Sequence, residues 1–223
     1  MTNRPVTLST YPPLPGGRPT HEASKVFPLE TDIDGLLELA LGAPIAVKAK
    51  NLAPAWSPFA YTEGRRLAAQ CKSACALVYD LDNPDCDYAA LQARLEASGY
   101  VHAVHETYTQ GRARVVIPTS RDINPKEYPS LWSKLAIELG LEPDPSGKDL
   151  ARLFYAPSFD GLRETWAFSG GSVLYDPGGS FENEGSAPRI MDLAKSKSII
   201  DLAKSSEQVA GNSGDEKQSQ KFF

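Results

Sequence analysis

Two pairs of charged residues at alternate positions carry the strongest chemical signal in the sequence. Asp80 and Asp82 end the apolar run in "ALVYDLDNPD", and Arg112 and Arg114 lie in "GRARVVIPTSR". Residues two apart in a strand share a face, so each pair is expected to point into one cleft. Paired carboxylates suit Mg²⁺ or Mn²⁺, because hard divalent ions prefer oxygen ligands. Paired guanidinium groups suit the oxygens of a triphosphate.

A second acid and a further arginine follow downstream. In "DPSGKDLARLFYAP", Asp144 lies in a turn and Arg152 follows it where a strand is expected to begin. An acid pair, a basic pair, an acid and an arginine together make sense as a nucleotidyl-transfer site. The alternative for the arginines is a surface strand with solvated charges.

The Asp-x-Asp pattern alone fits other functions. It also fits a sugar-nucleotide transferase, a haloacid-dehalogenase-like phosphatase, or two aspartates that only cap a strand. The phosphatase is disfavoured because Asn83 and Pro84 follow the acids where small Thr-bearing turn residues are expected. A glycosyltransferase would need a sugar-nucleotide fold upstream, and the first 75 residues look too short for one.

Composition sets the class of protein. The chain has 223 residues, of which 41% are hydrophobic and 23% charged, as is ordinary for a soluble globular protein. It has no apolar run of ~18 residues and no signal peptide at its start, so we expect no membrane association and a cytoplasmic location. Its three cysteines lack C-x-x-C spacing and are interpreted as reduced thiols.

Basic residues are concentrated locally although the net charge is −5. One cluster runs from Lys48 to Lys72, and another comprises Arg112, Arg114 and Arg121. Template contacts are predicted in the first cluster, through phosphates, and Trp56 or Tyr61 is a candidate for stacking on a base. A core position for Trp56 is the alternative. The predicted template or nucleotide contacts are Lys50, Arg65 and Arg66 in this cluster, with Gln110 and Asp149 further along the chain.

The order of predicted elements indicates an α+β fold with a mixed or antiparallel sheet and flanking helices. Helices are expected in "DIDGLLELALG", in "CDYAALQARLEASG", and after Asn124 and Glu127, where Pro129 delays the regular helix. The strands are "PIAVKAK", "LVYDLD", "ARLFYAPS", "ETWAFSGGSVLYD", and a hairpin of "YVHAVHETYT" with "RARVVIPT". Three parts are expected: an irregular arm (1–25), a catalytic domain (26–177), and a largely disordered tail (178–223) with the near-repeat "IMDLAKSKS", "IIDLAKSSE" at 190–207.

Four segments in series carry a family resemblance: "PAWSPFAYTEGRR", "ALVYDLD", "ETYTQGRARVVIPTSRDINPKEYPSLW" and "LEPDPSGKDLARLFYAPS". Over about residues 53–158 they resemble the archaeo-eukaryotic primase superfamily, specifically the primase-polymerase domains of phage and plasmid replication proteins. The resemblance implies an RRM-like palm as the catalytic core. It also implies synthesis of DNA or primers on a single-stranded DNA template from NTP or dNTP, with a pair of Mg²⁺ or Mn²⁺ ions.

The resemblance also implies roles for individual residues. Its first motif falls on Asp80 and Asp82, which with Asp144 would be the catalytic metal ligands. Its second falls on Arg112 and Arg114, which with Arg152 would bind the nucleotide. Asp149 is the alternative third acid, and a salt-bridged structural role for it is equally plausible because Lys148 is its neighbour.

One departure from the family favours a second hypothesis. Relatives commonly carry Ser-His in the hairpin loop, whereas this chain has Thr109 and Gln110, and His105 lies well back along the strand. Gln110 and the net acidity therefore keep open a catalytically weak or inactive primase-like DNA-binding module. The tail would recruit a replicative helicase or a single-strand-binding protein.

Overall fold

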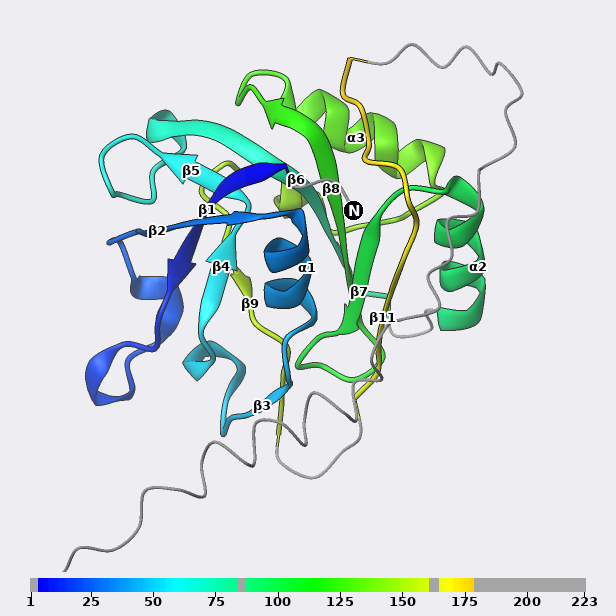
Figure 1. Ribbon diagram of the computed structural model, residues 1–223. Coiled ribbons are helices and arrows are strands. Elements are labelled where there is room, and N and C mark those ends of the chain that lie inside the picture. Colours follow the sequence, from blue (N-terminus) through cyan, green and yellow to red (C-terminus); the bar gives the residue numbers. More distant parts are fainter. Residues whose placement is uncertain (1–3, 84–86, 161–164, 179–223) are drawn as a thin grey trace, which may run out of the picture. The chain divides into compact units, whose positions relative to one another are not determined.

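Two antiparallel sheets form the body of the protein in a computed structural model (Figure 1). The structure describes residues 4–83, 87–160 and 165–178, all within one compact unit. The predicted tail lies outside the described residues except for Gly178, and so does Cys86. The described helices include none that is long and apolar enough to cross a membrane.

The larger sheet has five strands in the order β11-β7-β8-β6-β5. Its centre is formed by the long strands β6 (Cys71–Leu81) and β8 (Ala113–Ile123), which β7 (His102–Glu106) extends as the predicted hairpin partner of β8. The edges are β5 (Phe59–Tyr61) and β11 (Ala167–Gly170). All of its described pairings are antiparallel, which confirms the predicted fold class.

A four-stranded sheet in the order β2-β1-β4-β9 lies beside it. Its strands are β1 (Pro5–Tyr11), β2 (Phe27–Asp32), β4 (Ala55–Ser57) and β9 (Phe154–Tyr155). A short parallel pair joins β3 (Ile45–Ala46) to β10 (Ser158–Phe159), so "PIAVKAK" forms a strand over only two residues.

The prediction of an irregular arm over residues 1–25 is wrong for β1. This strand pairs with β2 on one side and β4 on the other, and its alternate residues Val6 and Leu8 are buried. The prolines and glycines that suggested an arm begin only after Tyr11, where two short 3₁₀ turns follow at Pro15–Gly17 and Thr20–Glu22. The alternation of apolar residues along β1 indicates a strand here, and it outweighs the Pro- and Gly-rich composition of residues 1–25.

Three helices cover the larger sheet from both faces (Figure 1). Helix α1 (Ile33–Leu41) packs on one face, and α2 (Tyr88–Ser98) and α3 (Tyr128–Glu138) pack on the other. The predicted C-terminal ends of α1 and α2, at Gly42 and Gly99, are confirmed. The Asp32 and Asp87 side chains accept hydrogen bonds from backbone N–H groups in the first turns, and Gly99 ends α2 in the left-handed region at φ 69°.

Helix α3 begins at Tyr128, so the turn 124–127 precedes regular helix as the position of Pro129 suggested. Its Trp132 lies over Tyr79 at a centroid distance of 5.0 Å and donates from Nε1 to the Val78 carbonyl oxygen at 2.8 Å. This contact fixes α3 on the centre of β6.

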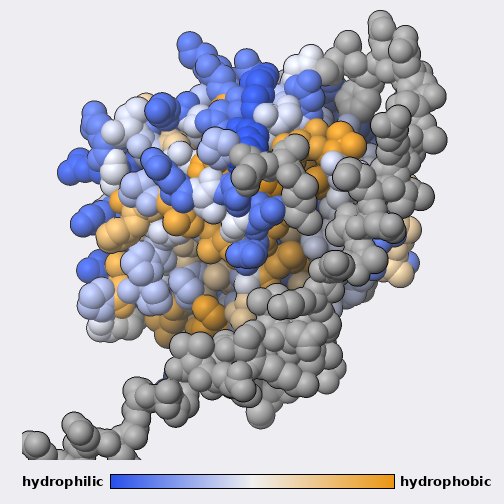
Figure 2. All heavy atoms as spheres, in the orientation of Figure 1, coloured by the Kyte–Doolittle hydropathy of each residue, from blue (hydrophilic) through white to orange (hydrophobic). Residues whose placement is uncertain are grey.

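Figure 2 shows that the surface carries hydrophilic residues beside exposed hydrophobic ones. Phe27 and Ile45 are two of the exposed large hydrophobic residues.

Candidate active site

The Asp-x-Asp and Arg-x-Arg motifs lie opposite each other on neighbouring strands. Asp80 of β6 is the register partner of Arg114 of β8, so their side chains share a face of the sheet. Arg114 Nε donates to Asp80 Oδ1 at 2.7 Å, and the two residues are only 3% and 7% exposed. The two predicted motifs therefore form one buried ion pair.

Arg114 is held from several sides. Its Nη1 donates to the carbonyl oxygen of Tyr155, and its guanidinium carbon lies 5.0 Å from the centroid of the Phe154 ring. Phe154 and Tyr155 form β9, so the arginine ties the end of the smaller sheet to the centre of the larger one. Its orientation is therefore fixed by packing as well as by charge.

The downstream acid is brought to the same place by a backbone contact. Asp144 N donates to the carbonyl oxygen of Asp80 at 2.8 Å, which holds the loop before the 3₁₀ helix η5 (Pro145–Lys148) against the end of β6. The Asp144 carboxylate accepts from the backbone N–H and the hydroxyl of Ser146 at 2.9 and 2.5 Å. These bonds orient the carboxylate at the start of η5.

Arg152 joins the two acids. Its Nη2 lies 3.5 Å from Asp80 Oδ2 and 3.4 Å from Asp144 Oδ2. Asp82 lies one residue past the end of β6 and pairs with Arg112 at 3.3 Å, with about half of the Asp82 side chain exposed. Each of the three predicted acids is thus paired with an arginine.

A pocket of about 270 Å³ opens beside this cluster. Basic side chains outnumber acids among its described lining residues, so it attracts anions. The lining comprises His21, Lys50, Arg66, Asp80, Arg114, Asp149, Ala151, Arg152, Leu153 and Tyr155. The pKa of Lys50 is lowered, mainly by burial and in addition by the nearby positive charge of Arg114.

The electrostatics of the acids follow from their partners. Burial acts to raise the pKa of Asp80, but the charge and hydrogen bond of Arg114, with Arg152 and Lys50, outweigh it and hold that pKa below its ordinary value. Hydrogen bonds from Ser146 lower the pKa of Asp144, assisted by Arg152. Both carboxylates are therefore ionised at neutral pH.

His105 stands in the same row of the sheet as the buried ion pair. It is the register partner of Arg114 on β7, and burial lowers its pKa to about 3. The ring is neutral at pH 7, with Nδ1 donating to the Glu106 carbonyl oxygen at 2.8 Å. Its Nε2 is buried and makes no hydrogen bond with the described residues.

The predicted template residues divide into two groups. Lys50 and Arg66 line the pocket, although Arg66 is committed to the carbonyl oxygens of His21 and Ala151 at 2.6 and 2.9 Å. Arg65 forms an isolated backbone β-bridge with Lys25, and Gln110 is exposed in the β7–β8 turn. The pocket lining includes neither residue.

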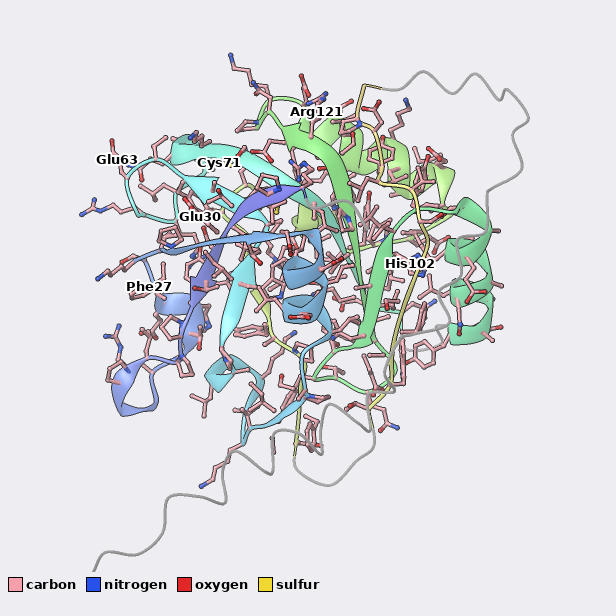
Figure 3. All side chains as sticks on the ribbon, in the orientation of Figure 1. Phe27, Glu30, Glu63, Cys71, His102 and Arg121 are labelled. Carbon is pink, nitrogen blue, oxygen red and sulfur yellow. The ribbon has the colours of Figure 1, made fainter. Side chains whose placement is uncertain are left out.

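Other predicted residues have structural roles. Asp149 Oδ1 accepts from Ala151 N at 2.9 Å, and the residue also lines the pocket. Trp56 is 1% exposed and packs on Phe154, so the core alternative holds and base stacking is excluded in this conformation. Arg121, labelled in Figure 3, lies toward the other end of β8 from Arg114 and pairs with Glu127 at 3.1 Å. It is not part of the site.

Two of the pocket residues that were not predicted from the sequence, His21 and Tyr155, carry polar side chains. His21 Nδ1 lies 3.2 Å from the Tyr155 hydroxyl, and both residues line the pocket. His21 belongs to the Pro- and Gly-rich segment, where no periodicity marks it. Tyr155 stood inside a predicted strand, but only the pairing of β9 with β4 reveals which way that strand runs.

The donor set suits one hard divalent cation. Asp80 and Asp144 present oxygens within reach of a single Arg152 nitrogen, and Mg²⁺ is commonly held by one or two carboxylates together with substrate phosphates. The described residues contain no group of three or more His, Cys, Asp or Glu side chains arranged to hold a metal ion. Asp80 and Asp144 therefore fit a divalent cation as part of its ligand set, with the other ligands coming from phosphate oxygens, water or the third predicted acid, Asp82.

An α+β domain with acids and arginines at the end of its central strands defines the class expected from the sequence, a primase-polymerase-like domain. Residues 59–169 match the family described as the VapE N-terminal domain. The match runs from β5 into β11 and includes the three predicted acids and Arg112, Arg114 and Arg152. The recognition of a primase-polymerase-like domain of phage and plasmid replication proteins is thus confirmed.

Two solved structures resemble the chain at 15% sequence identity. One is the archaeo-eukaryotic primase domain of the primase-polymerase of cyanophage S-2L, with a TM-score of 0.43, covering 79% of this chain and 86% of that one. The other is the polymerase domain of Mycobacterium tuberculosis ligase D in complex with DNA, with a TM-score of 0.37 and 67% of each chain covered. No curated protein matches the sequence.

Proposed function

We propose that the chain is the primase-polymerase domain of a mobile-element replication protein, which transfers nucleotides to a DNA 3′-hydroxyl on a single-stranded template. The observation that carries the proposal is the convergence of Asp80, Asp144, Arg114 and Arg152 at the edge of a cationic pocket. Residues from β6, β8 and the segments on both sides of η5 meet there although more than 70 positions separate the first from the last in sequence.

The proposed roles follow from position and charge. The 3′-hydroxyl oxygen attacks the α-phosphorus of the NTP or dNTP, and the bond to the departing pyrophosphate breaks. Arg112, Arg114 and Arg152, together with Lys50 of the pocket lining, bind the triphosphate and offset its charge as it redistributes toward the leaving group. No protein side chain forms a covalent bond to the substrate.

The acids would hold the metal ions. Asp80, Asp82 and Asp144 are the proposed ligands of Mg²⁺ or Mn²⁺, which would lower the pKa of the attacking hydroxyl and neutralise phosphate charge. Asp82 is the half-exposed member, and its partner Arg112 is accessible too, so this pair is the one open to primer and template. Proposed template contacts are Arg65 and Gln110, together with Lys50 and Arg66 at the pocket.

A second candidate function is a primase-like module that binds DNA without synthesis. The pairing of every predicted acid with an arginine favours it, because each carboxylate must leave a cation before it can bind a metal. Recruitment of a replicative helicase or a single-strand-binding protein through residues 190–207 is proposed from the sequence repeat alone.

The test is primer synthesis and extension on single-stranded DNA with Mg²⁺ or Mn²⁺. We expect activity in the wild type and its loss in Asp82→Ala, which is half-exposed and should fold normally. Glu127→Ala is the matched control, since Glu127 is equally exposed and also pairs with an arginine, at 3.1 Å. Full activity in Asp82→Ala would exclude the proposed metal site.

A binding experiment separates the two candidates. A polymerase domain should bind labelled dNTP with Mn²⁺ and bind it more weakly when Arg152 is changed to Gln. A pure binding module should bind single-stranded DNA with an affinity that does not depend on nucleotide or metal. DNA binding in the absence of dNTP binding would favour the second candidate.

A further inference from the structure

Arg152 is the more exposed and less tightly held of the two arginines on Asp80. Its side chain is 35% exposed, and its contacts to Asp80 and Asp144 are 3.5 and 3.4 Å long. Arg114 is 3% exposed, is held to Asp80 at 2.7 Å and is packed on Phe154. Two arginines contact Asp80. Arg152 is the one that can move away without leaving a buried charge uncompensated, because Arg114 stays paired with Asp80.

The position of Arg152 conflicts with metal binding. One nitrogen, Nη2, lies near the facing oxygens of both carboxylates. A divalent cation bound between these oxygens would stand beside the guanidinium charge, and like charges at such separations repel strongly in a partly buried site. The guanidinium must therefore move before Asp80 and Asp144 can share a metal ion.

The charge of the cluster points the same way. The described site sets Lys50 and three arginines against three carboxylates, so its balance is already slightly positive. Free divalent cations gain little from such a site, whereas a triphosphate gains from each of the basic groups. A triphosphate also offers Arg152 a better partner than two carboxylates at 3.4 and 3.5 Å, because phosphate oxygens accept bidentate bonds from arginine.

We propose that Arg152 couples metal binding to nucleotide binding: it holds Asp80 and Asp144 together until a nucleoside triphosphate draws its guanidinium away, and only then do the two carboxylates bind a divalent cation tightly. This inference rests on the proposed function. It makes Arg152 a positioning residue for the metal ligands as well as a phosphate contact. By linkage, the metal must raise nucleotide affinity by the same factor.

The first measurement is the affinity of the protein for Mn²⁺ in the absence of nucleotide. The electron paramagnetic resonance signal of free Mn²⁺ reports how much of the ion is bound. Removing the guanidinium charge should free the two acids, so we expect Arg152→Gln to bind Mn²⁺ at least about fivefold more tightly than the wild type, within the range of typical coupling factors. Arg121→Gln is the matched control, since Arg121 is a half-exposed arginine with a single acidic partner outside the site, and it should leave Mn²⁺ affinity unchanged.

The second measurement is equilibrium dialysis of radiolabelled dATP with and without Mn²⁺, in the absence of DNA. In the wild type, Mn²⁺ should tighten dATP binding about tenfold or more. In Arg152→Gln, the effect of Mn²⁺ on dATP affinity should be smaller. Arg152→Lys keeps a cation at this position and should retain weak binding of Mn²⁺ alone. Circular dichroism of each variant checks that it is folded.

The outcomes are separable. If the wild type binds dATP but Arg152→Gln binds Mn²⁺ no better than the wild type does, the coupling is overturned while the proposed function stands. If the wild type binds no dATP under any condition, the proposed function fails and the coupling fails with it. Tighter Mn²⁺ binding in Arg152→Gln, together with a reduced effect of Mn²⁺ on its dATP binding, supports the inference.

Discussion

Replacing Asp80 by Asn should destabilise the fold far more than replacing Asp82. Asp80→Asn removes the charge that compensates Arg114, and Arg114 is 3% exposed and is held in place by the carbonyl oxygen of Tyr155 in β9. Breaking a buried ion pair from one side typically costs about 3–5 kcal/mol, because the remaining charge is left buried. Asp82 and Arg112 form a half-exposed pair at 3.3 Å, whose loss should cost about 1 kcal/mol or less.

Urea unfolding of Asp80→Asn, Asp82→Asn, Arg114→Leu and the wild type measures the differences. The double variant Asp80→Asn, Arg114→Leu supplies the cycle, since removing both charges should recover much of the loss of the single variant. Equal and small losses in the two Asn variants would refute the assignment of Asp80–Arg114 as a buried pair. So would a double variant whose loss equals the sum of the two single changes.

Two further predictions concern the surroundings of the site. Because burial lowers the folded pKa of His105 to about 3, the fold should lose stability as the pH falls below about 6.5, by up to ~1.4 kcal/mol per unit. His105→Asn should flatten the dependence of the free energy of unfolding on pH between 6.5 and 4.5; an unchanged slope would contradict the neutral, buried ring. Gly147→Ala places a Cβ atom 2.9 Å from Trp132 Cζ2 and should cost about 1–3 kcal/mol in thermal or urea unfolding, while an unaltered midpoint would show that η5 can shift freely.

Local signals in the sequence predicted the helices well. Asp32, Asp87 and Gly99 act on the backbone within a few residues, so their effect on helix ends does not depend on the rest of the chain. The β7–β8 hairpin was likewise predicted, because its two strands are neighbours in sequence. Composition misled where the Pro-rich stretch at 12–19 concealed the alternating pattern of β1 just before it.

The site was predictable in its residue types but not in its pairing. The patterns around Asp80 and Arg114 indicated two facing groups, yet the register that sets them opposite each other depends on the whole length of β6 and β8. The contact between Asp144 N and the Asp80 carbonyl oxygen joins segments 64 positions apart, and no local pattern encodes it. The sequence therefore suggested arginines free to grip phosphate, whereas the structure shows Arg114 spanning Asp80 and β9.

This pairing changes which residue is the best probe of activity. Asp80 supports the fold through Arg114, so loss of activity in an Asp80 variant would not separate chemistry from stability. Asp82 lies beyond the end of β6 with half of its side chain exposed, and its removal should leave the core intact. Activity measurements on Asp82 therefore report on the site itself.

The central claim is tested most directly by primer extension on single-stranded DNA with Mn²⁺ and dNTP, comparing wild type, Asp82→Ala and Glu127→Ala at matched folded concentrations. The proposed function predicts extension by the wild type and Glu127→Ala, with a loss of at least about a hundredfold in Asp82→Ala, as expected for removal of a group that stabilises the transition state. Equal extension by all three proteins, or none by the wild type with either metal, would contradict it.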